Sequence, residues 1–140
     1  MIKLEIKIYD QLNNDSRCIR ETVFIYEQQF TVEFDDIDAI SKHIVLYVND
    51  KPIGVCRVYK DNEYYIIGRV AILKEYRKDG YGSIIVKSAE DLIKSLGGNL
   101  IKLSAQCRIK KFYQSLGYEC IGEEYLDEYC PHITMIKKIV

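Results

Sequence analysis

"VAILKEYRKDGYGSIIVKSAEDL" (residues 70–92) joins a pattern typical of a strand to one typical of a helix, through a turn that contains two glycines. Upstream, the apolar run at 64–72 predicts a buried strand. Downstream, an apolar stripe at helical spacing predicts a helix that ends at Gly97; its members are Ile85, Ala89, Leu92 and Leu96. A further strand is expected at 99–105. A strand, a helix and a strand in this order predict a parallel strand pair.

Patterns on either side of this unit predict a mixed α/β chain. Strands are expected at 2–9, 43–48, 53–59, 118–126 and 132–140, with a hairpin turn at "NDKP" (49–52). Helices are expected at 16–30, with the apolar stripe Ile19, Val23, Tyr26 and Phe30, and at 109–116, where Gly117 ends the helix. The first strand alternates apolar and charged residues, so its apolar row is predicted to be buried; this row is Ile2, Leu4, Ile6 and Ile8. The acidic stretch "EFDDID" (33–38) is expected to form a loop or short helix. No Pro/Gly/Ser-rich linker divides the chain, which predicts one domain over residues 1–140.

The composition excludes several classes of function. The chain has 140 residues, with 20 basic and 21 acidic side chains and a net charge of −1, so it lacks the basic excess of a nucleic-acid-binding protein. No apolar run approaches the roughly 18 residues of a membrane span, and the N-terminus lacks the pattern of a signal peptide. Five cysteines without a CxxC pair favour neither a metal site nor a disulfide framework, and predict a reduced, cytoplasmic protein.

The turn "RKDGYG" (77–82) has the features of an anion site. The first N–H groups of a helix lack partners within the helix and carry partial positive charge. Gly80 and Gly82 leave the backbone open to an anion, and Arg77 and Lys78 add charge. The spacing matches neither a Walker loop nor a complete Rossmann loop, whose third glycine is replaced by Ile85. On this pattern alone, a glycine turn with solvated charges remains an alternative.

A second motif, "FYQSLGY" (112–118), follows about thirty residues later. Together, "VAILKEYRKDGYGSIIVKSAEDL" and "LSAQCRIKKFYQSLGYECIGEEYLDEYCPHITM" resemble the GNAT family of N-acetyltransferases, in particular a small bacterial single-domain subgroup. The resemblance is strongest over 66–135 and extends to 21–58. It implies a central, mixed but mostly antiparallel, twisted sheet with a parallel, splayed strand pair, flanked by helices. It also implies transfer of the acetyl group of acetyl-CoA directly to a primary amine, without a metal.

The resemblance assigns roles to individual residues. The diphosphate of coenzyme A is expected at the turn, at Arg77, Lys78, Asp79, Gly80, Tyr81, Gly82 and Ser83. The pantetheine arm is expected along Val70, Ala71 and Ile72, with the neighbouring strand opening a slot near Gln106. Tyr113 stands where the family places the acid that protonates the departing thiolate; a phenol with a pKa of about 10 is protonated at pH 7.

The acceptor side of the slot is less defined by the sequence. Glu27, Arg69 and His132 are candidate substrate-binding residues, and Glu27, His132, His43 or a water molecule could serve as the base. Arg69, in an apolar strand, requires a partner, either from "EFDDID" or from a substrate carboxylate. The carboxylates of that segment, Glu33, Asp35, Asp36 and Asp38, are predicted to attract a cationic amine.

The predicted partner is a small-molecule or peptide amine, and neither nucleic acid nor membrane. The chain is expected to be a monomer or homodimer. An acyl-CoA-binding or sensing module without catalytic activity is the alternative function.

Overall fold

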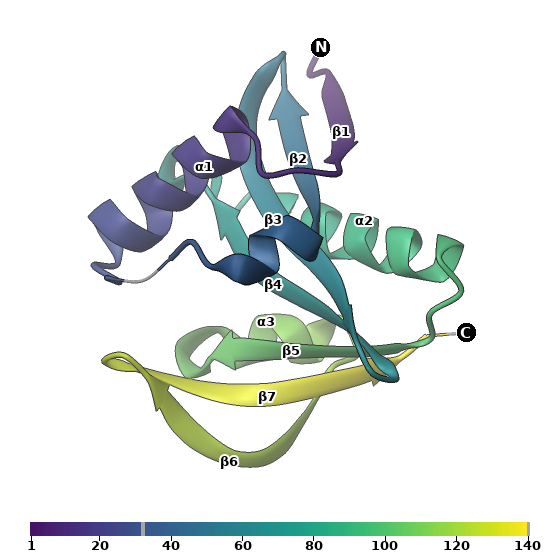
Figure 1. The fold of residues 1–140 in the computed structure, drawn as a ribbon. Coiled ribbons are helices and arrows are strands. Elements are labelled where there is room, and N and C mark those ends of the chain that lie inside the picture. Colours follow the sequence, from purple (N-terminus) through teal and green to yellow (C-terminus); the bar gives the residue numbers. More distant parts are fainter. Residues whose placement is uncertain (32, 140) are drawn as a thin grey trace.

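The computed structural model describes residues 1–31 and 33–139 and contains one seven-stranded sheet with the order β1-β2-β3-β4-β5-β7-β6 (Figure 1). The strands are β1 (Leu4–Tyr9), β2 (Lys42–Val48), β3 (Lys51–Asp61), β4 (Tyr64–Ile72), β5 (Leu100–Gln106), β6 (Glu119–Asp127) and β7 (Cys130–Lys138). All neighbouring strands are antiparallel except β4 and β5. The predicted mixed, mostly antiparallel sheet is confirmed.

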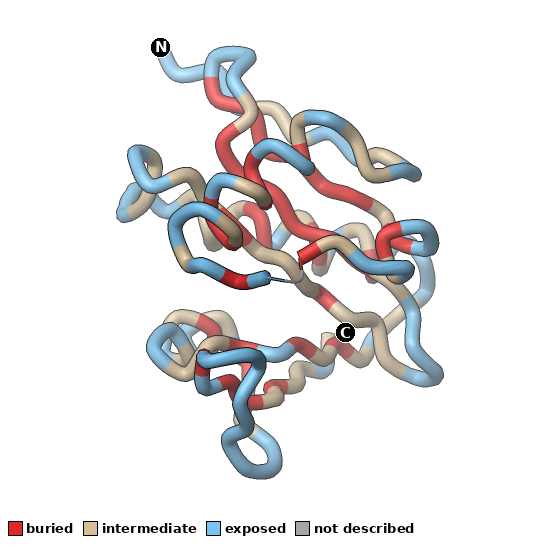
Figure 2. Tube along the Cα trace, turned by 60° about the vertical axis from the view of Figure 1, so that its left-hand side comes forward, coloured by how far each residue is buried: buried red, intermediate tan, exposed pale blue. Residues whose placement is uncertain are grey.

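Helices cover both faces of the sheet. The helix α1 (Asn14–Arg20) and its π-helical continuation (Glu21–Glu27) pack on one face, where they form an apolar cluster with β2 and β3. The helices α2 (Tyr81–Ser95) and α3 (Lys110–Ser115) pack on the other face around a larger cluster. Short 3-10 helices occupy Asp36–Ile40, Lys74–Tyr76 and Cys107–Ile109. Buried segments follow the central strands, whereas β6 is largely exposed (Figure 2).

The parallel pair β4–β5 is short. The two strands pair at Tyr65↔Ile101 and Ile66↔Lys102, and no pairing continues beyond these residues within the described part of the chain. From there the strands separate as they run toward their C-terminal ends (Figure 1). The predicted parallel, splayed pair is therefore confirmed, and the backbone of β4 after Ile66 has an edge without a strand partner.

A bulge marks the separated part of β4. Val55 on β3 lies opposite Ala71 and Arg57 lies opposite Gly68, so Arg69 and Val70 together face one residue of β3. Arg69 has φ +54°, a left-handed conformation that a non-glycine residue adopts at a cost of about 1–2 kcal/mol. Bulges bend a strand and redirect its side chains. The bulge therefore turns Arg69 and Val70 at the point where β4 leaves β5.

Two predictions about buried faces are wrong. The apolar row of β1 is largely exposed, with Leu4 47% and Ile8 49% exposed, because β1 is an edge strand and only Ile6 packs against the larger cluster. In the helix predicted at 16–30, Tyr26 is 75% exposed although it fits the α-helical stripe. The π-helical turns at Glu21–Glu27 explain this, because they rotate successive residues by less than an α-helix does.

Turn predictions agree with the structure. Asn49 and Asp50 have φ of 50° and 68° between β2 and β3, the conformation of a two-residue hairpin turn. Gly97 and Gly117 follow α2 and α3 with φ of 86° and 95°. No helix within residues 1–31 and 33–139 is long and apolar enough to cross a membrane.

Gly98 allows the chain to approach the start of the parallel pair. A Cβ atom placed on Gly98 would lie 2.4 Å from the ring of Tyr65 and 2.7 Å from Ile93. We expect Gly98→Ala to lower the free energy of unfolding by about 2 kcal/mol or more, because the added methyl group overpacks this contact. Gly97→Ala is the control, with φ 86° and no atom within 4 Å of the added Cβ, and should cost about 1 kcal/mol. Urea unfolding followed by circular dichroism measures both, and equal losses would contradict the overpacking.

Candidate active site

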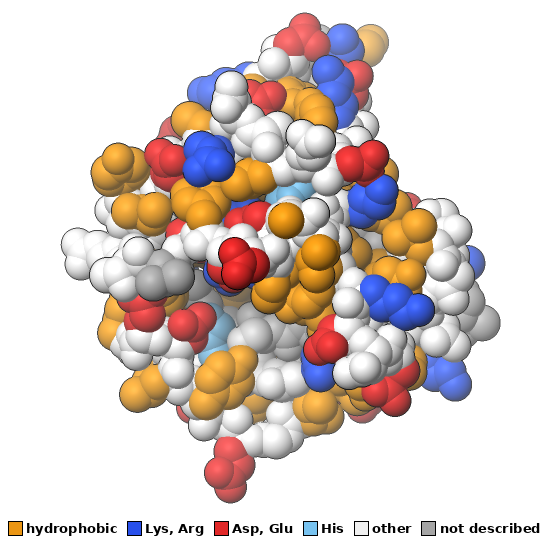
Figure 3. Space-filling view, viewed as in Figure 1, with side chains coloured by type: hydrophobic (Ala, Val, Ile, Leu, Met, Phe, Trp, Pro, Cys, Tyr) orange, Lys and Arg blue, Asp and Glu red, His pale blue; other side chains and the backbone are white. Residues whose placement is uncertain are grey.

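A cavity of about 200 Å³ opens between the separated strands β4 and β5. One wall is β4, with Ile66, Ile67, Gly68, Arg69 and Val70; the other includes Ser104, Gln106 and His132 on β5 and β7. Phe24, Gln28 and Phe30, from the segment that follows α1, also line it. Figure 3 shows the molecular surface hollowed between the two halves of the sheet. The slot predicted from the sequence is therefore present in the structure.

Tyr113 reaches this cavity from α3. The side chain is 5% exposed, and its ring contacts Phe112 and Tyr118 edge-on at 5.0 and 5.9 Å between ring centroids. Burial raises the pKa of the phenol, so it stays protonated throughout the neutral range. A protonated hydroxyl at the wall of the cavity can donate a proton or a hydrogen bond to a group inside it.

Gln106 ends β5 and ties it to the opposite layer. Its side-chain nitrogen donates to the side-chain oxygen of Gln28 at 2.8 Å, and its oxygen accepts from Nε of Arg108 at 2.9 Å. The tip of the β6–β7 hairpin adds contacts to the same segment: Glu128 accepts from the backbone and hydroxyl of Thr31, and the Tyr129 hydroxyl donates to the Gln28 carbonyl. These contacts connect the segment after α1 to β5 and to the β6–β7 hairpin, beside the cavity that Gln28 and Gln106 line.

Three arginines and three carboxylates form a closed ring of ion pairs above β3 and β4. In order around the ring they are Arg20, Glu33, Arg69, Asp35, Arg57 and Asp38, with N–O distances from 2.6 to 3.3 Å. Each guanidinium contacts two carboxylates and each carboxylate contacts two guanidiniums. The ring extends from Arg20, which is completely buried, to Asp35, whose side chain is 33% exposed. Its net charge is zero, as buried charges require.

The arginines of the ring lower the pKa of two of its carboxyl groups, Asp38 and Asp35, whereas burial raises the pKa of Glu33. Burial by itself raises the pKa of Asp38, but the hydrogen bonds and charges of Arg20 and Arg57 outweigh burial and bring the pKa to about 2. The hydrogen bond from Arg57 lowers the pKa of Asp35. His43 on β2 supports the same segment, with Nε2 3.0 Å from the Asp38 carbonyl oxygen, and burial lowers its pKa. His43 does not line the cavity, so it lies away from any ligand there.

The ion pairs of the ring test two predictions about the acidic segment "EFDDID" (33–38). The expectation that Arg69 pairs with "EFDDID" is confirmed by its contacts with Glu33 and Asp35. The expectation that these carboxylates attract a cationic amine is wrong for Glu33, Asp35 and Asp38, because arginines already neutralise them. Sequence reasoning missed Arg20 and Arg57. An arginine inside the apolar strand "IGVCRVY" was the available signal for Arg57, as it was for Arg69.

The glycine turn precedes α2. Gly80 has φ 82°, a conformation that favours glycine, and no atom lies within 4 Å of a Cβ atom placed on it. The backbone at Gly80 is therefore open to a ligand. Gly82 has a different constraint, because a Cβ atom there would lie 3.2 Å from the ring of Phe112 on α3. No side chain caps the helix, so the N–H groups of its first turn, which includes Tyr81, Gly82 and Ser83, are available to an anion.

Arg77 and Glu27 pair with each other. The two guanidinium nitrogens of Arg77 lie 2.5 and 2.7 Å from the carboxylate oxygens of Glu27, and Nε donates to the Ile72 carbonyl at 2.9 Å. The hydrogen bond from Arg77 lowers the pKa of Glu27, which makes Glu27 a weaker base. Arg77 thus holds the turn against the π-helical segment. Lys78 is exposed at the turn, and Asp79 follows it directly.

Comparison with known proteins identifies the family. Residues 11–139 match the family model described as an acetyltransferase (GNAT) domain. The chain belongs to this family. The N-acetyltransferase YjcF of Bacillus subtilis, which is named as uncharacterized, is 36% identical over 126 residues, covering 88% of this chain and 90% of YjcF. Family membership makes the chain an acyltransferase, as its sequence motifs predicted.

Solved structures agree with this assignment. The crystal structure of Escherichia coli ElaA matches with a TM-score of 0.84 and 26% identity, over 99% of this chain and 100% of that chain. An aminoglycoside 6′-N-acetyltransferase complexed with coenzyme A matches with a TM-score of 0.75 and 16% identity, over 97% of each chain. At that identity the likeness shows the fold alone.

We expect Asp38→Asn to lower the free energy of unfolding at pH 7 by about 3 kcal/mol, because it leaves two buried guanidiniums short of an acceptor. The Asp38 pKa is depressed from 3.8 to about 2, so its contribution is present above pH 4 and is lost as the pH falls toward 2. This difference corresponds to about 2 kcal/mol. The deficit of the variant should therefore shrink between pH 5 and 2.

Asp36→Asn is the matched control, since Asp36 lies in the same segment but is exposed and outside the ring. Its effect should stay within about 0.5 kcal/mol. Urea unfolding at a series of pH values tests both variants. Similar losses in the two would show that the ring does not stabilise the fold.

Proposed function

We propose that this chain transfers the acetyl group of acetyl-CoA directly to a primary amine. The observation that carries the proposal is the slot between β4 and β5, because it combines an unpaired strand edge with a protonated phenol. The strand edge after Ile66 offers backbone groups that can pair with the amide groups of a pantetheine arm. The cavity leaves room on its other side for an acceptor.

The donor is proposed to bind with its diphosphate at the start of α2. Support comes from the uncapped helix end and the open backbone at Gly80. Arg77 is engaged by Glu27, so the charge of the turn itself comes from Lys78, and we assign Arg77 the role of holding the turn in place. Asp79, Tyr81, Gly82 and Ser83 would meet the diphosphate through the backbone, as the resemblance implies. Val70, Ala71, Ile72 and Gln106 would flank the arm.

The chemistry requires an oxyanion donor and an acid. Attack of a neutral amine on the thioester carbon places negative charge on the carbonyl oxygen, and a backbone N–H of the β4 bulge would stabilise it. The carbon–sulfur bond then breaks, and Tyr113 donates its proton to the departing sulfur. The phenol is restored by the proton that the amine nitrogen loses as it becomes an amide. Direct transfer needs no covalent enzyme intermediate.

Arg69 is proposed to shape the acceptor side rather than to bind a substrate carboxylate, because Glu33 and Asp35 already pair with it. Glu27 is a poor candidate for substrate contact, since it pairs with Arg77 and is absent from the cavity wall. We also expect the protein to act in the reducing cytoplasm, where its five unbonded thiols would persist.

Acetyl-CoA should stabilise the fold. At a concentration about 100 times its Kd, linkage adds about 2.7 kcal/mol to the free energy of unfolding. Ser83→Glu should raise this Kd at least tenfold, because it places a negative charge beside the proposed diphosphate. Ser83→Ala is the matched control and should change the Kd less than twofold, since the proposed contact is through the backbone. Isothermal titration calorimetry measures both. Equal affinities for the two variants would remove the start of α2 from the donor site.

Tyr113→Phe should lower kcat by about 10²–10⁴-fold and leave the Kd for acetyl-CoA nearly unchanged, as expected for a general acid. Tyr118→Phe is the control, because the Tyr118 hydroxyl donates to Glu90 at 2.7 Å and Tyr118 does not line the cavity. The assay measures release of free thiol from acetyl-CoA with a panel of primary amines. A Tyr113→Phe enzyme with wild-type kcat would show that water protonates the thiolate.

The alternative function, an acyl-CoA-binding module without catalysis, makes a different prediction. Such a module would bind acetyl-CoA, with the effects of Ser83→Glu described above, and would release no thiol with any amine. The thiol-release assay on the wild-type protein therefore distinguishes an acetyltransferase from a binding module.

A further inference from the structure

His132 lies on β7 in the wall of the cavity and is 6% exposed. Its Nδ1 atom is 2.9 Å from the carbonyl oxygen of Cys130. A carbonyl oxygen only accepts hydrogen bonds, so Nδ1 carries the proton and donates it. In the neutral ring, Nε2 therefore holds an unprotonated lone pair. This contact selects the tautomer in which Nε2 is basic.

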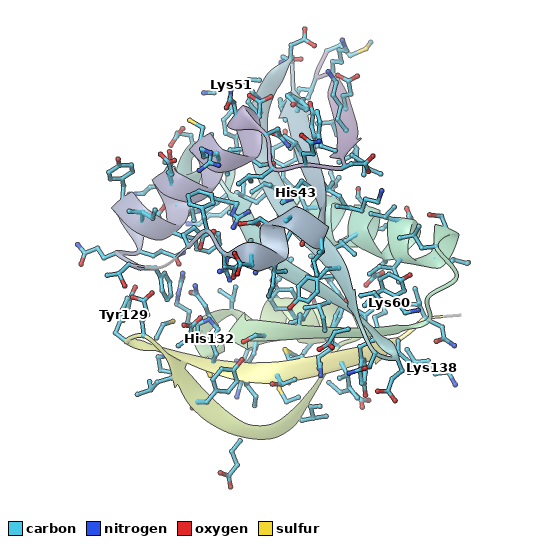
Figure 4. All side chains as sticks on the ribbon, in the orientation of Figure 1. His43, Lys51, Lys60, Tyr129, His132 and Lys138 are labelled. Atoms are coloured by element: carbon cyan, nitrogen blue, oxygen red, sulfur yellow. The ribbon has the colours of Figure 1, made fainter. Side chains whose placement is uncertain are left out.

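Two aromatic side chains fix the plane of the imidazole. Tyr125 on β6 stacks against it, with 6.0 Å between centroids and an angle of 28°. Phe30 meets it edge-on at 6.4 Å and 69°. Tyr125 is itself held by its hydroxyl contact with Ser104. Figure 4 shows His132 beside β5 and β7, on the side that faces the segment after α1. Among the residues that the structure describes, no hydrogen bond uses its Nε2.

We infer that His132 is the general base that removes a proton from the acceptor amine. This inference rests on the proposed acetyl transfer. A primary amine is mostly ammonium at pH 7 and cannot attack until it loses a proton. Nε2 takes that proton and the ring becomes imidazolium, while the freed lone pair of the amine forms the bond to the thioester carbon. The imidazolium then releases its proton to water, so base and acid are separate groups, His132 and Tyr113.

Other candidate bases have competing partners. Glu27 pairs with Arg77, and His43 is buried against the Asp38 carbonyl outside the cavity wall. The titratable and charged groups that share the cavity or contact the ring of His132 are Tyr59, Tyr113, Tyr125, Asp127, Arg108, Glu33, Arg57 and Arg69. Glu33, Arg57 and Arg69 belong to the neutral ring of ion pairs. Carboxylates are as a class weaker bases than imidazole, so Asp127 is less suited than His132 to take a proton from an ammonium ion.

The test variant is His132→Asn, whose amide nitrogen can still donate to the Cys130 carbonyl but which lacks a basic nitrogen. We expect kcat/KM at pH 7 to fall by about 10²–10⁴-fold with the Kd for acetyl-CoA unchanged. The acidic limb of the wild-type profile of kcat/KM against pH should disappear in this variant and be replaced by dependence on hydroxide. In His132→Ala, added imidazole should restore part of the lost rate, because it supplies the missing base in the vacated space.

Nitrogen NMR of the wild-type enzyme tests the geometry independently of activity. The neutral His132 ring should be protonated at Nδ1, and an Nε2-protonated ring would overturn the inference. A His132→Asn enzyme that keeps the wild-type pH profile would also overturn it, while transfer by the wild-type enzyme would leave the proposed function intact. If the wild-type enzyme transfers acetyl to none of a polyamine, an aminoglycoside, an arylethylamine and a peptide, the proposed function and the role of His132 both fail.

Discussion

The ring of three arginines and three carboxylates is the constraint on which the upper half of the molecule depends. It joins α1, the segment after residue 32, β3 and β4, and these elements form both a core face and a wall of the slot. Arg20 is fully buried, so it must keep both acceptors to avoid an uncompensated charge. The same ring contains Arg69, the residue of the β4 bulge with the left-handed conformation, and ties its side chain to Glu33 and Asp35.

The slot follows from the way the sheet is divided. Strands β1–β4 form one half of the sheet and β5, β7 and β6 form the other; the described residues of β4 and β5 pair at two positions, although both halves contribute to the larger apolar cluster. Because the ladder stops at Ile66, the two halves can diverge without breaking further hydrogen bonds. The residues proposed for the chemistry are then distributed between the two halves: the bulge comes from β4, whereas Tyr113, Gln106 and His132 come from α3, β5 and β7.

Much of this arrangement could be predicted from the sequence. Apolar periodicity located the strands, and the order of strand, helix and strand predicted the parallel pair. Roles for individual residues could be predicted only from the family resemblance, because the pattern formed by Arg77, Gly80 and Gly82 does not by itself specify a ligand. The lone Arg69 in an apolar strand predicted its acidic partners, but the closed ring depends on Arg20 and Arg57 lying next to them in space. Periodicity wrongly predicted that Leu4 and Tyr26 are buried. Leu4 lies on an edge strand that extends past the apolar cluster, and Tyr26 lies in π-helical turns, which have a different period from an α-helix. The tautomer of His132 depends on a carbonyl that no sequence pattern reveals.

The contacts beside the slot have a consequence for how this scaffold can diverge. The Glu128–Thr31 and Tyr129–Gln28 contacts lie beside the smaller apolar cluster, because Tyr129 stacks on Phe30, but Thr31, Glu128 and Tyr129 are themselves exposed. Substitutions of the exposed polar residues Thr31 and Glu128 change this contact without removing buried apolar area. Selectivity for a bulkier or slimmer amine can therefore drift by mutation while the folding free energy stays nearly constant. The catalytic framework and its substrate range are encoded in separable parts of the chain.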